Sequence, residues 1–152
     1  MVIHEAKLSY NSEEKDISEY PILGRADLVA NYMKEAFIQY PLQESFWIIC
    51  VNQKNRVISR HMTSLGTANS TLAHPREIFR PAFLTNCTSI ICAHNHPSGD
   101  LAPSGADITL TKILKEAGKI LDIQLLDHVI LGQIDCDPLN RGYYSFREAG
   151  II

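Results

Sequence analysis

The sequence has no long apolar run and no strong excess of charge of either sign. No segment approaches the ~20 apolar residues needed to span a bilayer. The N-terminal stretch Met-Val-Ile-His-Glu-Ala-Lys has no basic region followed by an apolar core, so we expect neither a transmembrane helix nor a signal peptide. A net charge of -3 gives no whole-protein attraction for nucleic acid, and only a local basic patch stays open for that role.

Cysteine is scarce and shows no pairing pattern. The four cysteines include no Cys-x-x-Cys pair, and Cys50 and Cys92 lie in apolar runs. A free cysteine in such a run behaves as a small hydrophobe, so we expect a reducing, cytoplasmic setting. The hydrophobic fraction of 45% is ordinary for a globular protein, and 152 residues favour one domain.

Apolar runs and turn residues predict alternating helices and strands. The predicted elements are a helix over 25–40, a hairpin of strands 46–51 and 56–64, a helix from Pro75, a strand over 90–93, a helix starting at Ser104, a strand over 125–131 and a short strand over 143–146. The hairpin requires antiparallel pairing and the strand–helix–strand crossing requires parallel pairing. We therefore expect an α/β fold (α+β by strict bookkeeping) with a mixed β-sheet flanked by helices.

Two further expectations concern the ends and the faces of these elements. Residues 1–24 are expected to form an N-terminal extension, with Val2 to Tyr10 as a candidate edge strand, before a domain over 25–152. Helical spacing predicts that Leu28, Tyr32 and Ala36, extended by Tyr40, form the inward face of the first helix. The same spacing predicts for the helix after Ser104 a buried face of Ile108, Ile113, Leu114, Ala117, Ile120 and Leu121.

Potential metal ligands gather between Ser89 and Asp107. His94 and His96 end an apolar strand and point to the same side, because side chains alternate along a strand. Asp107 returns on the next helix. Two imidazoles and one carboxylate suit zinc, and three protein ligands leave a fourth position for water. This pattern is typical of a catalytic rather than a closed structural site.

Two of these assignments have alternatives. Ser104-x-x-Asp107 is close to a capping box, which stabilises a helix start without chemistry, and both roles can hold at once. Cys92 shares the face of the histidines and thiolate binds zinc well. A strand rise of ~3.3 Å per residue places Cys92 about 6–7 Å from His94, which favours a place in the core.

A hydrolytic metal site also needs a base, because zinc lowers the pKa of its water to about 7 and the proton must be taken up. Two glutamates are candidates. Glu44 immediately precedes the first buried strand, which can aim it into the same cleft. Glu77 lies in a first helical turn, where an acid suits the helix dipole without any active site. The spacing favours Glu44.

The order of these residues resembles a known motif. His94-x-His96, seven residues, Ser104-x-x-Asp107, with Glu44 upstream, is similar to the JAMM motif of JAB/MPN-domain metalloproteins. Three further blocks resemble the bacterial RadC-like branch of that family. They are His74-Pro-Arg-Glu77, Ala93-His-Asn-His-Pro-Ser-Gly-Asp100 and Leu126-Asp-His-Val-Ile-Leu-Gly132.

The resemblance implies a cytidine-deaminase-like sandwich carrying Zn²⁺, with 25–152 as a RadC-like JAB/MPN domain. His94, His96 and Asp107 would be the metal ligands. Glu44 would be the general base, and Ser104 would hydrogen-bond the water or the developing oxyanion. Related enzymes hydrolyse peptide or isopeptide bonds, so the resemblance implies a zinc metalloprotease with a peptide or isopeptide substrate.

Two other functions stay open. The first is an accessory factor in DNA repair or on mobile elements, as the RadC resemblance suggests, for which Lys112, Lys115 and Lys119 are a candidate patch and a solvated face the simpler interpretation. RadC proteins carry a helix-hairpin-helix region before this domain, and residues 1–24 contain nothing like it, which weakens direct nucleic-acid binding. The second is a non-catalytic MPN scaffold, against which the intact ligand set argues.

Some features receive no firm role from the sequence. Deaminase chemistry is not expected, because the His-x-Glu and Pro-Cys-x-x-Cys signature is absent. For Asp127 and His128, which belong to a family block, a contact to one of the metal ligands is our hypothesis. The substrate and the oligomeric state do not follow from this sequence.

Overall fold

The computed structural model describes residues 21–66 and 74–152, so the candidate strand Val2 to Tyr10 lies outside the described residues. The helices and strands are α1 (Ala26–Ile38), β1 (Glu44–Val51), β2 (Val57–Gly66), α2 (Pro75–Thr85), β3 (Ser89–Asn95), α3 (Gly105–Leu121), β4 (Gln124–Leu131), the 3-10 turn η2 (Ile134–Cys136) and β5 (Tyr143–Ser145). None of the described helices has the length and apolarity needed to cross a bilayer.

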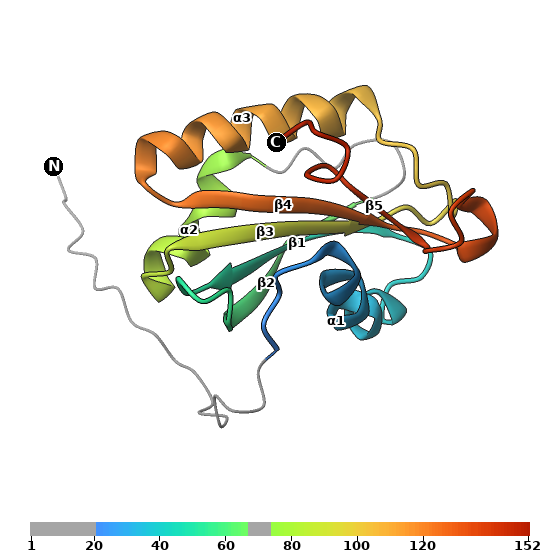
Figure 1. Ribbon diagram of the computed structural model, residues 1–152, viewed down its shortest axis with the longest axis horizontal. Helices are drawn as coiled ribbons and strands as arrows, with labels where there is room; N and C mark the ends of the chain where they lie inside the picture. The colour runs from blue at the N-terminus through green and yellow to red at the C-terminus, as the bar shows by residue number, and fades with distance from the viewer. Residues whose placement is uncertain (1–20, 67–73) are drawn as a thin grey trace, which may run out of the picture.

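The strands form one mixed sheet in the order β2-β1-β3-β4-β5. β1 is antiparallel to β2 and β3, β3 is parallel to β4, and β5 is antiparallel to β4. The predicted hairpin and the predicted parallel crossing are both confirmed. α1 covers one face of the sheet, while α2 and α3 lie over the other (Figure 1). The fold is therefore α/β with helices on both sides.

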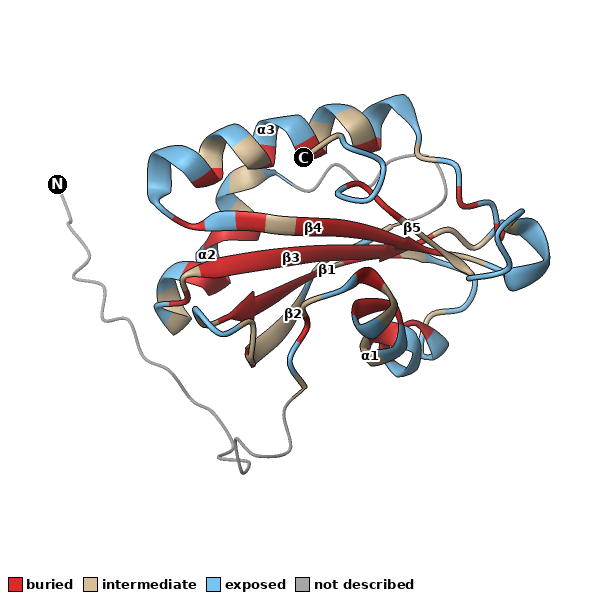
Figure 2. Cartoon of the chain, in the orientation of Figure 1, coloured by how far each residue is buried: buried red, intermediate tan, exposed pale blue. Residues whose placement is uncertain are grey.

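The core consists of two layers because alternate strand residues point to opposite faces. Ile49 and Val51 of β1 pack towards α1, whereas Ile48 and Cys50 pack towards α2 and α3. β3 is buried along its whole length (Figure 2). Burial on both faces explains why β1 and β3 read as continuous apolar runs rather than alternating ones.

The buried faces of two helices differ from the prediction. In α1, Ala36 is buried as expected, but Leu28 is 39% exposed, and the inward face is made by other residues: Ala26, Val29, Ala30, Met33 and Phe37. In α3, Ile113 and Ile120 are 48% and 85% exposed. The fully inward residues of α3 are Asp107, Thr111, Leu114 and Gly118.

The reason for the error in α3 is local. An added Cβ at Gly118 would lie 2.4 Å from the carbonyl oxygen of Ile123, so glycine permits the close approach of the helix to the chain entering β4. At the other end of α3, the buried positions are polar because they belong to the site described next. A prediction based on apolar residues alone therefore misses Gly118 near the end of α3 and the polar residues at its start, although both are buried.

Candidate metal centre

The candidate ligands meet where β3 ends and α3 begins. His94 lies in β3 and His96 directly follows it. The chain then reverses at Gly99, whose φ of +84° is a conformation that favours glycine and whose N–H donates to the carbonyl of His96. Ser104 caps α3, which places Asp107 in its first turn. The parallel crossing from β3 to β4 thus carries the start of α3 back to the histidines.

Ligand atoms of these three residues converge. The Nε2 atoms of His94 and His96 are 3.0 Å apart. Oδ1 of Asp107 lies 3.4 Å from Nε2 of His94, and Oδ2 lies 3.6 Å from Nε2 of His96. Donor atoms around a tetrahedral zinc are about 3.3 Å apart, given Zn–N distances of ~2.0–2.1 Å. Donor type and spacing therefore both fit a divalent metal such as zinc.

Asp107 combines the two roles that the sequence left open. Its Oδ2 accepts hydrogen bonds from the Ser104 N–H at 2.8 Å and from the Ser104 hydroxyl at 2.6 Å. The Ser104 oxygen in turn accepts from the Asp107 N–H, which completes a capping box. Oδ1 remains directed at His94. The cap fixes the carboxylate by one oxygen and presents the other to the site.

The electrostatics keep two members of this donor set, His94 and Asp107, in forms that bind cations. Burial lowers the pKa of His94 to about 4, although the charge of Asp107 opposes the shift, so the ring is neutral near pH 7. Burial alone would raise the pKa of Asp107, but hydrogen bonding to His96, the electrostatic interaction with His94 and the Ser104 donors hold it well below its usual value. A neutral imidazole and a carboxylate are the states that ligate metals.

His96 is oriented by the turn that follows it. Its Nδ1 lies 2.7 Å from the carbonyl oxygen of Asp100, which only accepts, so Nδ1 carries the proton. Nε2 therefore faces His94 and Asp107. Burial lowers the pKa of His96, but hydrogen bonds to Asp107 and to the Asp100 carbonyl, with the charges of Asp107 and Glu44, raise it overall.

Glu44 is the first residue of β1 and lies at the same end of the sheet. It shares the face of Phe46, which pairs with His94 in the register, and its charge acts on His96. Asn95 of β3 connects this end of the sheet to β1, because its Oδ1 accepts hydrogen bonds from the N–H and the hydroxyl of Ser45, both at 2.9 Å. The sequence analysis did not single out Asn95; its position between the two histidines, facing the other side of the strand, is the available signal.

The competing residues take other places. Cys92 is fully buried in the core layer that also contains Phe46, and burial raises the pKa of its thiol, which favours the core position over a ligand role. Glu77 lies in the first turn of α2, where a carboxylate suits the helix dipole.

His128 and Thr111 extend the site inward. Nε2 of His128 lies 2.8 Å from Nδ1 of His94, and Nδ1 of His128 lies 2.6 Å from the hydroxyl of Thr111. Burial holds the pKa of His128 well below its usual value, so this ring is neutral. Thr111 was missed by the sequence analysis, although its spacing of four from Asp107 puts both on one helical face.

The hypothesis for the pair Asp127 and His128 therefore holds for His128 and is wrong for Asp127. Adjacent strand residues face opposite sides of a sheet. Asp127 accepts from the Ser145 hydroxyl at 2.7 Å and from the backbone N–H groups of His128 and Arg147 at 2.7 and 3.1 Å. It ties β4 to the segment that contains β5.

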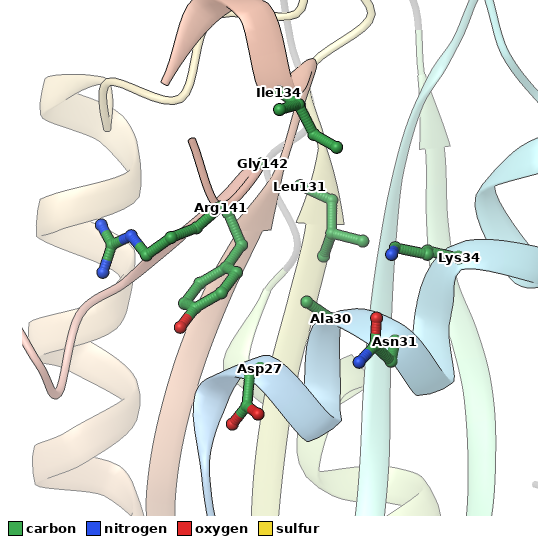
Figure 3. Close-up of a pocket in the computed structure, with 10 residues that line it drawn as sticks. Asp27, Ala30, Asn31, Lys34, Leu131, Ile134, Arg141 and Gly142 are labelled. Atoms are coloured by element: carbon green, nitrogen blue, oxygen red, sulfur yellow. The ribbon is translucent and has the colours of Figure 1, made fainter. Parts of the chain in front are cut away.

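Two hollows run along α1 beside this end of the sheet. One, of about 390 Å³, is lined by His96, Pro97, Phe37 and Ile38, among others. The other, of about 400 Å³, shares Lys34, Leu131 and Gly132 with the first. Figure 3 shows the Lys34 side chain reaching from α1 towards Leu131. Both hollows therefore lie on the α1 side of the sheet, and the first meets the candidate metal centre only at His96.

A mixed sheet carrying a His-x-His strand end, an aspartate in the next helix and a glutamate on the neighbouring strand defines an α/β protein of the JAB type with a candidate metal site. The sequence matches the RadC-like JAB domain over residues 23–151, and the chain belongs to this family.

Relatives agree with this assignment. The chain is 43% identical over 135 residues to UPF0758 protein tlr1707 of Thermosynechococcus vestitus, covering 89% of this chain and 49% of the relative. It is 50% identical over 123 residues to UPF0758 protein BCAH187_A4587 of Bacillus cereus, covering 81% of this chain and 51% of the relative. The chain therefore spans about half the length of the curated relatives it matches.

Proposed function

We propose that this domain is a zinc-dependent amide hydrolase of the metallopeptidase or isopeptidase type. The observation that carries the proposal is the convergence of the His94, His96 and Asp107 ligand atoms, which lie within 4.8 Å of one another. These three residues would hold the metal. A bound zinc ion would polarise the scissile carbonyl and lower the pKa of a water molecule to about 7.

Glu44 would supply the general base. It lies at the end of β1 on the face of Phe46, which pairs with His94, and its charge already acts on His96. In the proposed reaction its carboxylate takes a proton from the attacking water and returns it to the leaving amine, so that the carboxylate is regenerated.

Ser104 would stabilise the oxyanion. In the absence of substrate its hydroxyl donates to Oδ2 of Asp107 at 2.6 Å. A hydroxyl proton can rotate to a new acceptor, and Oδ2 keeps its backbone donor, the N–H of Ser104, when this happens. The capping box therefore tolerates the transfer of this hydrogen bond to substrate.

A polypeptide segment is the substrate class that the surroundings favour. The hollow beside His96 has apolar walls from Phe37, Ile38 and Leu131 and contains the cationic Lys34. A hollow of mixed character that reaches His96 suits a peptide, whose backbone is polar and whose side chains are partly apolar.

The proposal is tested by Glu44→Gln in zinc-loaded protein, with Glu77→Gln as the matched control and a peptide and isopeptide library as substrate. Loss of a general base costs about 10²–10⁴-fold in rate. We expect that loss in Glu44→Gln alone, with zinc content unchanged in both variants. Full turnover in Glu44→Gln would contradict the assignment, and zinc binding without turnover in wild type would favour the scaffold.

The DNA-associated alternative gains little from the surface of α3. Lys119 forms an ion pair with Glu116 at 2.7 Å, as residues three apart on a solvated helix often do. Since neither this pair nor the net charge of -3 favours a phosphate backbone, hydrolysis is the better-supported function.

A further inference from the structure

We propose that His128 and Thr111 are positioning residues that keep the proton of His94 on Nδ1 and so turn the Nε2 lone pair of His94 towards the metal. The inference rests on the proposed function, because it concerns a ligand of the same site. It adds two residues that neither touch the metal nor reach a substrate.

The direction of the hydrogen bonds follows from their inner end. The Thr111 hydroxyl lies 2.6 Å from the backbone carbonyl of Asp107, which can only accept. The single hydroxyl proton is therefore donated to this carbonyl, and the hydroxyl oxygen must accept from Nδ1 of His128 at 2.6 Å. Thr111 thus requires a proton on Nδ1 of His128.

The same reasoning gives the position of the proton on His94. A neutral imidazole carries one proton, so with Nδ1 protonated, Nε2 of His128 is an acceptor. It lies 2.8 Å from Nδ1 of His94, which must then be the donor. The remaining nitrogen of His94, Nε2, keeps its lone pair and is the atom 3.4 Å from Oδ1 of Asp107. One backbone carbonyl therefore fixes the tautomers of two rings.

The surroundings of His128 hold its ring in place. Phe146 stacks on it with ring centroids 4.7 Å apart and an interplanar angle of 10°, and Phe46 meets it edge-on with centroids 5.3 Å apart. His128 is fully buried between these rings, and apolar contact disfavours an imidazolium that would donate from both nitrogens. The ring can neither flip freely nor charge easily.

The chain of hydrogen bonds also couples two ligands. It begins at the carbonyl of Asp107, whose carboxylate lies in the site, and it ends at His94. A rotation of α3 would shift Thr111 and Asp107 together, so the hydrogen bonds tie the position of the helix to the orientation of the histidine. Partners of this kind typically contribute 10- to 100-fold to metal affinity.

The direct test is nitrogen NMR of the histidine rings in zinc-free protein labelled with ¹⁵N-histidine. We expect a proton on Nδ1 of both His94 and His128 in wild type. In Thr111→Val, which keeps the shape and removes the hydroxyl, we expect the tautomers to redistribute, with protonation of Nε2 becoming populated. Thr111→Ser keeps the hydroxyl and should restore the wild-type pattern.

Thr109→Val is the matched control, because the Thr109 hydroxyl makes the same kind of bond, to the carbonyl of Gly105 at 2.9 Å, on the exposed side of α3. Zinc affinity, measured by competition with a chelator, should fall by about 10- to 100-fold in Thr111→Val. It should stay at the wild-type value in Thr109→Val and return close to it in Thr111→Ser.

A wild-type His128 protonated on Nε2, or equal zinc affinity in Thr111→Val and Thr109→Val, would overturn the inference. The NMR pattern separates its failure from that of the proposed function. A protein that binds no zinc but has both rings protonated on Nδ1 would contradict the metal site and leave the tautomer assignment standing. A protein that binds zinc with the opposite tautomers would do the reverse.

Discussion

Among the residues that the structure describes, two aspartates are buried, and their carboxylates have different partners. Asp127 is 2% exposed, and both of its oxygens are occupied by donors of the chain: Oδ1 by two backbone N–H groups and Oδ2 by the Ser145 hydroxyl. Asp107 is 9% exposed, and its Ser104 donors bind Oδ2, while Oδ1 faces the Nε2 of His94. A carboxylate satisfied on every side stabilises a fold, and one held by a single oxygen is available to a cation.

The surroundings of the two groups reinforce this difference. Burial raises the pKa of Asp127 despite its hydrogen bonds. At Asp107 the effect of burial is exceeded by His96, His94 and Ser104, which lower its pKa and keep it negative. Negative charge held among imidazole nitrogens is what a divalent ion requires.

The largest expected difference between the two aspartates is in zinc binding after each carboxylate is exchanged for an amide. Asp107→Asn removes the anionic ligand and should weaken zinc binding by at least 100-fold, because a neutral amide oxygen is a poor zinc donor. Asp127→Asn should leave zinc affinity unchanged. Titration against a chelator gives both values, and equal losses in the two variants would show that the aspartates are not functionally distinct.

The second expected difference is in the stability of the zinc-free protein, where Asp127→Asn should have the larger effect. Asp127→Asn keeps one oxygen for the backbone N–H groups but places the amide nitrogen against the Ser145 hydroxyl, so this buried hydroxyl loses its acceptor. Such a loss costs about 1–3 kcal/mol of unfolding free energy. Urea unfolding of the zinc-free proteins should show this loss in Asp127→Asn, and an unchanged midpoint would contradict the structural role of Asp127.

The smallest effect concerns the cap of α3. Ser104→Ala removes the hydroxyl of the capping box but leaves the backbone N–H of Ser104 donating to Oδ2 of Asp107. The loss of an N-cap side chain costs about 1 kcal/mol. We expect a modest stability decrease with zinc still bound. If zinc were lost as well, the backbone donor would be insufficient to hold the carboxylate.

The part of the site that the sequence predicts is the part carried by short-range geometry. Alternation along β3 puts His94 and His96 on one side, and a hairpin followed by a strand–helix–strand crossing leads to the mixed sheet. The cap at Ser104 also follows from local spacing. Each of these features depends on residues that are close in sequence, so the residue pattern alone is sufficient to predict it.

The parts that were missed depend on contacts across the fold. The sequence analysis assigned the inward face of α3 from its apolar residues. In the structure Asp107 and Thr111 also point inward, where Asp107 lies against His94 and Thr111 against His128. Asp127 and His128 are adjacent in sequence yet lie on opposite faces of β4, and only the packing shows which one contacts the candidate ligand His94. Buried polar networks are decided by tertiary partners that periodicity does not contain.

The most direct test of the account is zinc content by elemental analysis of protein purified without added zinc. Wild type is compared with His94→Ala, and His74→Ala serves as control because His74 is exposed at the start of α2. We predict one zinc per chain in wild type and in His74→Ala, and none in His94→Ala. Absence of zinc in wild type even after zinc is offered back, or its retention in His94→Ala, would contradict the metal site.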